Sequence, residues 1–233
     1  MNQDLSNIDF PIYESRNNGY NDPLLRREDG TFPIKEGDYP AVCIFVADMG
    51  LQTDEYKGVK KDHHKMALGF ELPIPGSDER AIVYTTFNNT TFRNGGLAQL
   101  ANAVIKTRKD GMDLTEPDVN GKKFSAVQLL GKTMFARIKT HSKKGAPYKR
   151  AVLAGVYAQP YDTPGFTEQT VTPKTKPFAY VLSMGKNEAF EQLPYFLRQD
   201  IAKNLDPQAT DGKSIADQIT DGGEPIDVSD LPF

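Results

Sequence analysis

The sequence predicts a mainly β domain: a five-stranded barrel with one helix between its third and fourth strands, plus N- and C-terminal extensions. Five short apolar or alternating segments, separated by Gly, Pro and Asn turns, occur at residues 39–48, 65–72, 81–87, 133–140 and 151–157. One segment between the third and fourth has apolar residues at helical spacing. The apolar fraction is only 38%, with 19 Gly and 16 Pro, which indicates a compact core joined to much irregular chain.

The chain before the barrel has no hydrophobic period. Residues 1–34 mix Asn, Asp, Arg and Pro with scattered aromatic residues, so we expect an N-terminal arm there and the barrel over residues 35–160. The first strand, over residues 39–48, is apolar on both faces and carries Cys43, a single cysteine that we expect in the core. A polar loop is predicted over residues 52–62.

The remaining barrel elements follow in order. The second strand, residues 65–72, is stopped by Pro73, and the third covers residues 81–87. Turn and cap residues at 88–91 precede a segment with Leu97, Leu100 and Val104 at helical spacing, which predicts an amphipathic helix over residues 96–107. Three strands, a helix and two strands match the order of the oligonucleotide-binding (OB) barrel.

The last two strands lie in a stretch, residues 119–161, that has no Asp or Glu although the chain carries a net charge of −3. Its basic residues are Lys122, Lys123, Lys132, Arg137, Lys139, Lys143, Lys144, Lys149 and Arg150. The two strands and the loop over residues 142–147 predict a hairpin. A hairpin with only positive charge suits a polyanion; the alternative is a solvated edge whose lysines maintain solubility.

Two segments follow the barrel. Residues 161–205 are predicted to form an appendage, with a short strand over 178–182 and one or two short helices over 188–204, broken near Pro194. Residues 206–233 hold seven acids and one base, Lys213, for a charge of −6, so the rest of the chain carries +3. This end has too little apolar surface to offset its ordering entropy, and we expect it to be disordered.

The chain ends in Asp230-Leu231-Pro232-Phe233, preceded by Asp227. A terminal ring can fill a pocket on a partner while the neighbouring acids meet a basic rim. This end resembles the acidic tails of the single-stranded DNA-binding proteins of bacteria and their phages, with Leu231 where an isoleucine is usual. Ser229 stands where the family commonly has a further acid. In element order and charge, the barrel portion looks more like the phage-encoded members.

The resemblance implies sequence-independent binding of single-stranded DNA during replication, recombination or repair, in the bacterial host cell if the protein is phage-encoded. The tail would bind replication or recombination proteins. Its expected partner-binding residues are Asp227, Asp230, Leu231, Pro232 and Phe233.

Single-strand binding requires cations for phosphates and exposed rings for bases. The chain has no Trp, so Tyr or Phe must stack. Tyr56 and Tyr148 lie among lysines and are the better stacking candidates, whereas Phe87 and Phe92 are expected in the core. The predicted DNA-binding residues are Tyr56, Lys57, Lys60, Lys61, Arg93, Arg137, Lys139, Lys143, Lys144, Tyr148, Lys149 and Arg150.

No catalytic residue, metal ligand or cofactor is predicted. Gly131-Lys132-Thr133 lacks the earlier glycine of a phosphate-binding loop, because Ala126 occupies that position. Two alternatives stay open: an adaptor that uses the barrel for protein contacts, and a metal-dependent nuclease or recombination enzyme. The acids that could build a nuclease site are Asp54, Glu55 and Asp62.

No apolar run approaches the roughly 20 residues needed to cross a bilayer. The N-terminus lacks the basic and apolar regions of a signal peptide. We therefore expect a soluble, cytoplasmic protein without a membrane partner. The sequence leaves open a homodimer formed through the appendage.

Overall fold

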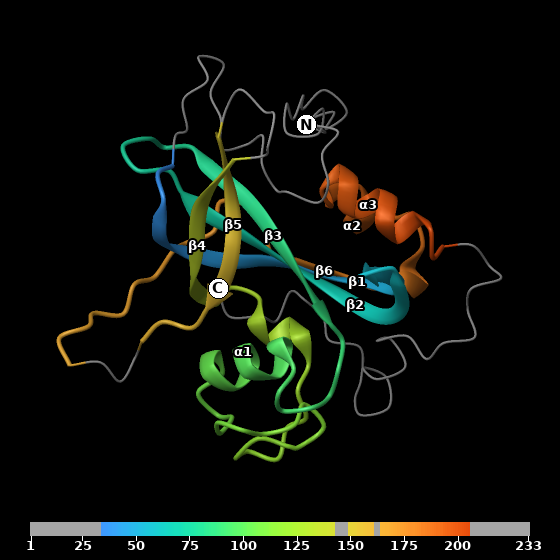
Figure 1. Cartoon of the computed structure of the whole chain (residues 1–233). Helices are drawn as coiled ribbons and strands as arrows, with labels where there is room; N and C mark the ends of the chain where they lie inside the picture. Colours follow the sequence, from blue (N-terminus) through green and yellow to red (C-terminus); the bar gives the residue numbers. More distant parts are fainter. Residues whose placement is uncertain (1–33, 143–148, 161–163, 206–233) are drawn as a thin grey trace.

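The computed structural model describes residues 34–142, 149–160 and 164–205, without the side chains of residues 56, 140–142 and 149–152 (Figure 1). The five main strands are β1 (Gly37–Tyr56), β2 (Val59–Pro73), β3 (Arg80–Asn88), β4 (Thr133–Ser142) and β5 (Lys149–Tyr157). They pair antiparallel in the order β3-β2-β1-β4-β5. The predicted mainly β class is confirmed. The expected N-terminal arm and acidic tail lie almost wholly outside the described residues.

The remaining elements are short. Helix α1 (Gly96–Val104) follows β3 in the chain and precedes the 3₁₀ turn η4 (Ala126–Leu129) and β4. Strand β6 (Phe178–Tyr180) pairs with β1 in parallel. The 3₁₀ turn η5 (Leu182–Met184) leads to α2 (Glu188–Gln192) and α3 (Tyr195–Ala202), which are separated at Pro194 as the sequence predicts.

Both faces of β1 are buried. Residues 41–50 are all buried, and the strand contributes to two separate apolar clusters. A register shift between Cys43 and Phe45, opposite β2, marks a bulge in the middle of the strand. The two clusters explain why the first strand is apolar throughout, since it has no solvent-facing side over this length.

The first cluster lies between the sheet and α1. Cys43, Leu68, Phe70 and Val83 point into it from β1, β2 and β3, and Leu97 contributes from the helix. Burial raises the pKa of the Cys43 thiol far above its ordinary value, so this cysteine is a neutral core residue as predicted.

The second cluster is built by the C-terminal segment. Phe45 and Ala47 of β1 pack there with Tyr180 of β6, Phe190 of α2 and Leu197 of α3. Figure 1 shows α2 and α3 on the opposite side of the sheet from α1. Residues 171–205 therefore form part of the folded body and cover the outer face of β1 and β2.

A buried carboxylate ties this segment to β2. Glu71 is fully buried, and its oxygens accept hydrogen bonds from the backbone amides of Lys174 (2.7 Å) and Thr175 (2.9 Å). Arg80 of β3 lies 3.4 Å from the same carboxylate. Because a buried charge is stable only when it is paired and hydrogen-bonded, Glu71 selects the position of the segment that crosses it.

A buried arginine organises the chain between α1 and η4. Arg108 donates to the side chain of Asn102 (2.8 Å) and to the carbonyls of Asp113 (2.7 Å) and Glu116 (3.0 Å). Its guanidinium also lies 5.6 Å from the ring centre of Phe124. Arg108 thus links α1 to two backbone carbonyls of the segment between α1 and η4.

Gly69 gives a first test of the sheet packing. A Cβ at this position would lie only 1.9 Å from the Phe45 ring on the neighbouring strand. We expect Gly69→Ala to lower the free energy of unfolding by about 1–3 kcal/mol, as overpacking does. Urea denaturation measures this.

Gly155→Ala is the matched control, because a Cβ there meets no atom within 4 Å. It should leave stability unchanged or raise it by up to about 1 kcal/mol, since glycine weakens a strand interior. Equal stability of Gly69→Ala and the parent chain would contradict the described packing of Phe45.

Tyr180 gives a second test, through pH. Burial, with the nearby Asp48 charge, raises the pKa of Tyr180 to about 12 from 10.0. Between these values the unfolded chain releases the proton while the folded chain keeps it, so the free energy of unfolding falls as pH rises, by about 2–3 kcal/mol when complete.

Tyr180→Phe should remove the part of the alkaline fall in the free energy of unfolding that Tyr180 causes. It should cost little at pH 8, because the buried hydroxyl has no hydrogen-bond partner among the described residues. The control is Tyr195→Phe, since Tyr195 is 41% exposed. Urea melts at several pH values between 8 and 11.5 measure the difference; identical slopes for Tyr180→Phe and the parent chain would refute it.

Candidate nucleic-acid interface

The β4–β5 hairpin carries most of the predicted basic residues. The two strands pair from Phe135 opposite Tyr157 to Ser142 opposite Lys149, so the predicted hairpin strands are confirmed. Lys139 is exposed on β4, between buried Ile138 and the hairpin end. Lys149 and Arg150 lie in β5. The loop candidates Lys143, Lys144 and Tyr148 lie outside the described residues and stay predictions.

Arg137 lies on the predicted face of β4, with its charge engaged. Its Nε and Nη2 donate to the two Asp38 carboxylate oxygens at 2.7 and 3.0 Å. Its guanidinium lies 5.0 Å from the ring centre of Tyr157, and Nη2 also donates to the Tyr157 hydroxyl (3.5 Å). A bidentate pair of this kind is a strong, oriented contact, so Arg137 is a fixed planar group rather than a free cation.

Three aromatic rings lie beside the Asp38–Arg137 pair: Phe135, Tyr157 and Phe166. Phe135 and Tyr157 are cross-strand neighbours with ring centres 5.7 Å apart. The Phe166 ring meets Phe135 edge-on at 6.2 Å. All three are half-buried. The sequence reasoning missed these rings, although alternation along β4 places Phe135 on the same face as Arg137 and Lys139.

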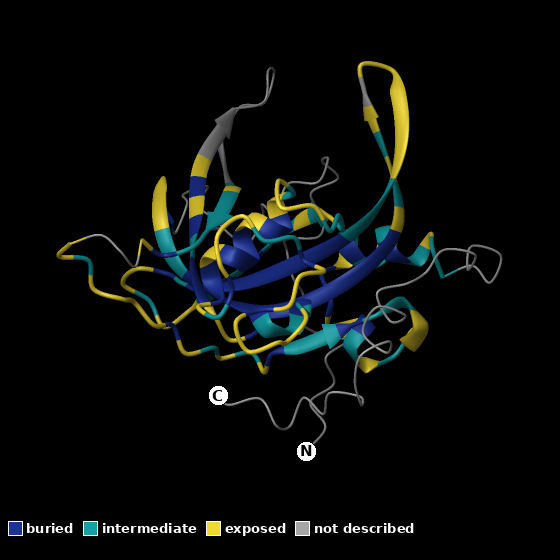
Figure 2. Cartoon of the chain, turned by 90° about the horizontal axis from the view of Figure 1, so that it is seen from below, coloured by how far each residue is buried: buried dark blue, intermediate teal, exposed yellow. Residues whose placement is uncertain are grey.

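The second basic cluster lies on a hairpin, and the predicted polar loop over residues 52–62 is wrong. β1 continues to Tyr56 and β2 starts at Val59, joined by Lys57 and Gly58 at φ of 51° and 78°. Two positive φ values are typical of the tight turn that best matches strand twist. The hairpin is exposed on both sides and extends beyond the sheet (Figure 2), so it has no apolar alternation to reveal it.

Acids compensate the lysines of this hairpin. Lys60 is opposite Glu55 and Lys61 is opposite Asp54, which also forms an ion pair with Lys65. Lys60 and Lys61 are exposed, as is Lys57 in the turn. Tyr56 ends β1. Because two of its cross-strand positions pair a base with an acid, the β1–β2 hairpin offers a weaker positive surface than the acid-free β4–β5 hairpin.

Arg93 lies apart from both hairpins. It is exposed in the segment between β3 and α1, and its backbone amide donates to Asp113. Figure 1 shows this segment beside α1, away from the hairpin end of β4 and β5. The sequence predicts both nearby rings, Phe87 and Phe92, in the core. Phe87 packs against the first cluster as expected, whereas Phe92 is 71% exposed and its predicted place in the core is wrong.

The acids of the nuclease alternative are engaged with their neighbours. Asp54 pairs with Lys65, and Asp62 accepts a hydrogen bond from the Thr53 hydroxyl at 2.6 Å. Within the described ranges, no three His, Cys, Asp or Glu side chains form a group that could hold a metal ion.

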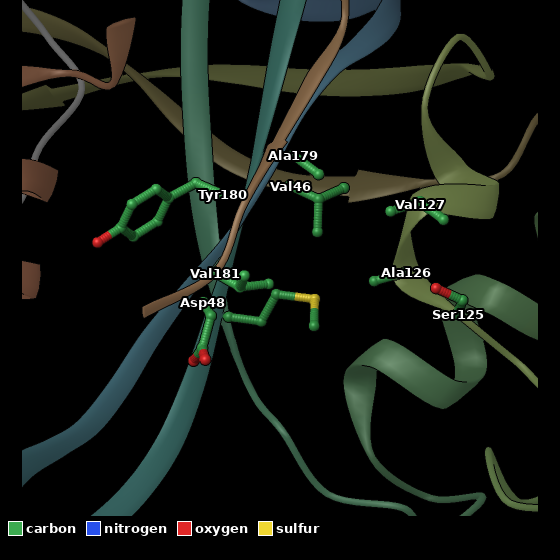
Figure 3. A pocket seen from close by; sticks show the side chains of 9 residues that line it. Val46, Asp48, Ser125, Ala126, Val127, Ala179, Tyr180 and Val181 are labelled. Carbon is green, nitrogen blue, oxygen red and sulfur yellow. The ribbon is translucent and has the colours of Figure 1, made fainter. Parts of the chain in front are cut away.

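A cavity of about 20 Å³ lies between β1, β6 and η4, lined by residues that include Val46, Met66 and Ala126. Figure 3 shows Tyr180 at the edge of the cavity, with its ring pointing away from η4. This space holds about one water molecule. It is too small for a substrate, and the surface that lines it is mostly apolar, with Asp48 and Ser125 at its border.

Comparisons with protein-family models, with curated proteins and with solved structures found no match to this chain. In the part of the chain that the structure describes, no helix is both long and apolar enough to span a membrane.

The Asp38–Arg137 pair can be tested by titration. Hydrogen bonds from Arg137 and Tyr157 hold the pKa of Asp38 below its ordinary 3.8, against a small opposing effect of burial. The stabilisation from the pair is therefore present above the ordinary value and is lost as pH falls through the lowered one. Arg137→Gln should return the pKa toward 3.8, measured by carboxyl carbon NMR; an ordinary value in the parent chain would contradict the pair.

Proposed function

We propose that this chain binds single-stranded DNA without sequence preference, through an OB-type barrel, and recruits replication or recombination proteins through its acidic tail. The observation that carries the proposal is the meeting of two features on one side of the sheet. An acid-free basic hairpin lies there beside half-buried rings and a fixed guanidinium. Cations for the backbone and planar groups for bases are the two requirements of single-strand binding.

The strand order supports an OB-type barrel. In that fold the first strand pairs with both the second and the fourth, and the helix follows the third strand. Here β1 pairs with β2 and with β4, and α1 follows β3. The hydrogen-bonded path runs from β3 to β5, and these two strands approach until Cα atoms lie within 8 Å. No ladder joins β3 to β5 among the described residues, so the sheet is open, and the approach of its two edges is what supports a barrel-like form.

The hairpins suit the ligand site of such a barrel. OB domains bind oligonucleotides with the loops that join strands 1 to 2 and 4 to 5. Figure 2 shows the β1–β2 hairpin and the coloured part of β4 rising on the same side of the molecule. The C-terminal segment covers the outer face of β1 and β2. The DNA strand would therefore bind on the side of β4 and β5.

The charge distribution assigns unequal roles to the hairpins. The β4–β5 hairpin supplies the main phosphate contacts, because no acid lies in its strands. The compensated β1–β2 hairpin contributes less. Tail residues 206–233, with a charge of −6, compete with DNA for the basic surface until a strand or a partner protein displaces them.

Lys139→Glu tests the proposal at a described residue. We expect it to weaken binding to a labelled dT oligonucleotide about tenfold or more at low salt, because it replaces a phosphate contact with a repulsion. The matched control is Lys186→Glu, which makes the same charge change at an exposed site near α2. Fluorescence anisotropy at two salt concentrations measures both.

Equal losses in the two variants would mean that only net charge matters. A parent chain without salt-sensitive binding would refute the proposed function.

A chain ending at Leu205 removes the tail while keeping a residue that packs against the second cluster. It should bind as tightly as the parent chain or more tightly. No DNA binding by this shortened chain would favour the adaptor alternative.

A further inference from the structure

The outer face of the β1–β4–β5 side is organised in two rows of cross-strand neighbours. Asp38, Arg137 and Gly155 stand opposite one another in the first row. Pro40, Phe135 and Tyr157 form the second. Because side chains two positions apart on a strand share a face, these rows form one continuous surface.

Gly155 leaves this surface open. Its φ is not in the left-handed region, and a Cβ would meet no atom within 4 Å. Neither backbone conformation nor packing therefore requires a glycine here, although glycine weakens a strand interior. Strand glycines commonly mark a bulge or a place where a ligand approaches the backbone closely. A register shift between Arg137 and Ile138 puts a bulge on the Leu153 side of Gly155, while the Tyr157 side keeps regular register. The open space is bordered by Arg137 across the sheet and by Tyr157 along the strand.

The borders of this space are planar groups held in place. Asp38 fixes the Arg137 guanidinium with two hydrogen bonds, and the guanidinium lies 5.0 Å from the Tyr157 ring centre. Phe135 supports Tyr157 from the neighbouring strand, and Phe166 meets Phe135 edge-on. The Arg137 side chain is still 49% exposed. A preorganised pair of planes of this kind binds a flat π-system with little loss of side-chain entropy.

We propose that the space over Gly155, bordered by Tyr157 and Arg137, is a binding subsite for one unpaired nucleic-acid base. Bases stack on aromatic rings and on arginine planes regardless of their identity. Lys139, two residues beyond Arg137 on the same face of β4, lies where it can contact the adjoining phosphate. Asp38 is a positioning residue: it holds Arg137 flat and cancels its charge. This inference rests on the proposed function and deepens it.

The subsite predicts different salt behaviour for neighbouring residues. Loss of a stacking group lowers affinity at every salt concentration, whereas loss of a phosphate contact also lowers the salt dependence. Tyr157→Leu should therefore weaken binding of a dT oligonucleotide about 5- to 150-fold with an unchanged salt slope. Tyr157→Phe, which keeps the ring, should retain most of the affinity.

Asp38→Asn should act in the opposite direction. It frees the Arg137 charge but also releases its fixed position, so the slope of log K against log salt should steepen by about 0.7, with tighter binding at low salt and weaker binding at high salt. An unchanged slope would mean that Arg137 does not face the strand.

Gly155→Val closes the space without disturbing the fold, because its Cβ has room and β-branched residues favour strands. We expect unchanged or higher thermal stability and at least fivefold weaker binding at an unchanged salt slope. Tyr195→Leu on α3 is the matched control for loss of an exposed ring and should bind normally. Photocrosslinking with 5-iododeoxyuridine oligonucleotides should label Tyr157 or Phe135.

The outcomes separate the two proposals. If the parent chain binds DNA but Gly155→Val and Tyr157→Leu bind equally well, the base subsite is wrong and the proposed function stands. If the parent chain does not bind DNA, the proposed function itself fails. A Gly155→Val variant that is unstable leaves Tyr157→Leu against Tyr157→Phe, together with the crosslink, to decide the subsite.

Discussion

The double burial of β1 is the constraint on which the rest of the structure depends. A strand that is apolar on both faces requires a cover on each side, since its exposure would cost the free energy gained by removing apolar surface from water. α1 and the sheet interior cover one face, and β6, α2 and α3 cover the other. Apolar packing alone does not fix where the C-terminal segment lies on the sheet. Glu71 fixes its position, because the buried carboxylate accepts hydrogen bonds from the amides of residues 174 and 175.

This cover bears on the proposed binding of DNA. With the C-terminal segment over the outer face of β1 and β2, the part of the sheet left for a large ligand is the β4–β5 side and the projecting hairpins. The planar groups that lie on that side are held by one another rather than by the core. Asp38, Arg137 and Tyr157 form a chain of contacts across three strands.

The two hairpins differ in their net local charge more than in their number of lysines. Both are rich in lysine, but cross-strand pairing places Glu55 and Asp54 opposite Lys60 and Lys61. The β4–β5 strands have no acid in them. A polyanion responds to the summed local charge, so the hairpins contribute unequally to the potential that it meets.

The sequence by itself determined the mainly β class of the fold, the break at Pro194 and the acid-free character of residues 119–161, because each depends on local pattern. It failed for residues 52–62, where strands exposed on both sides have no alternation, and for Phe92, where apolar character alone does not ensure burial. Only the tertiary structure decided that Asp38 engages Arg137 and that Gly155 lies open beside Tyr157. Asp38 and Arg137 lie 99 residues apart, and the space over Gly155 depends on which residues of β4 and β1 lie beside it. Both depend on register, which no local pattern contains.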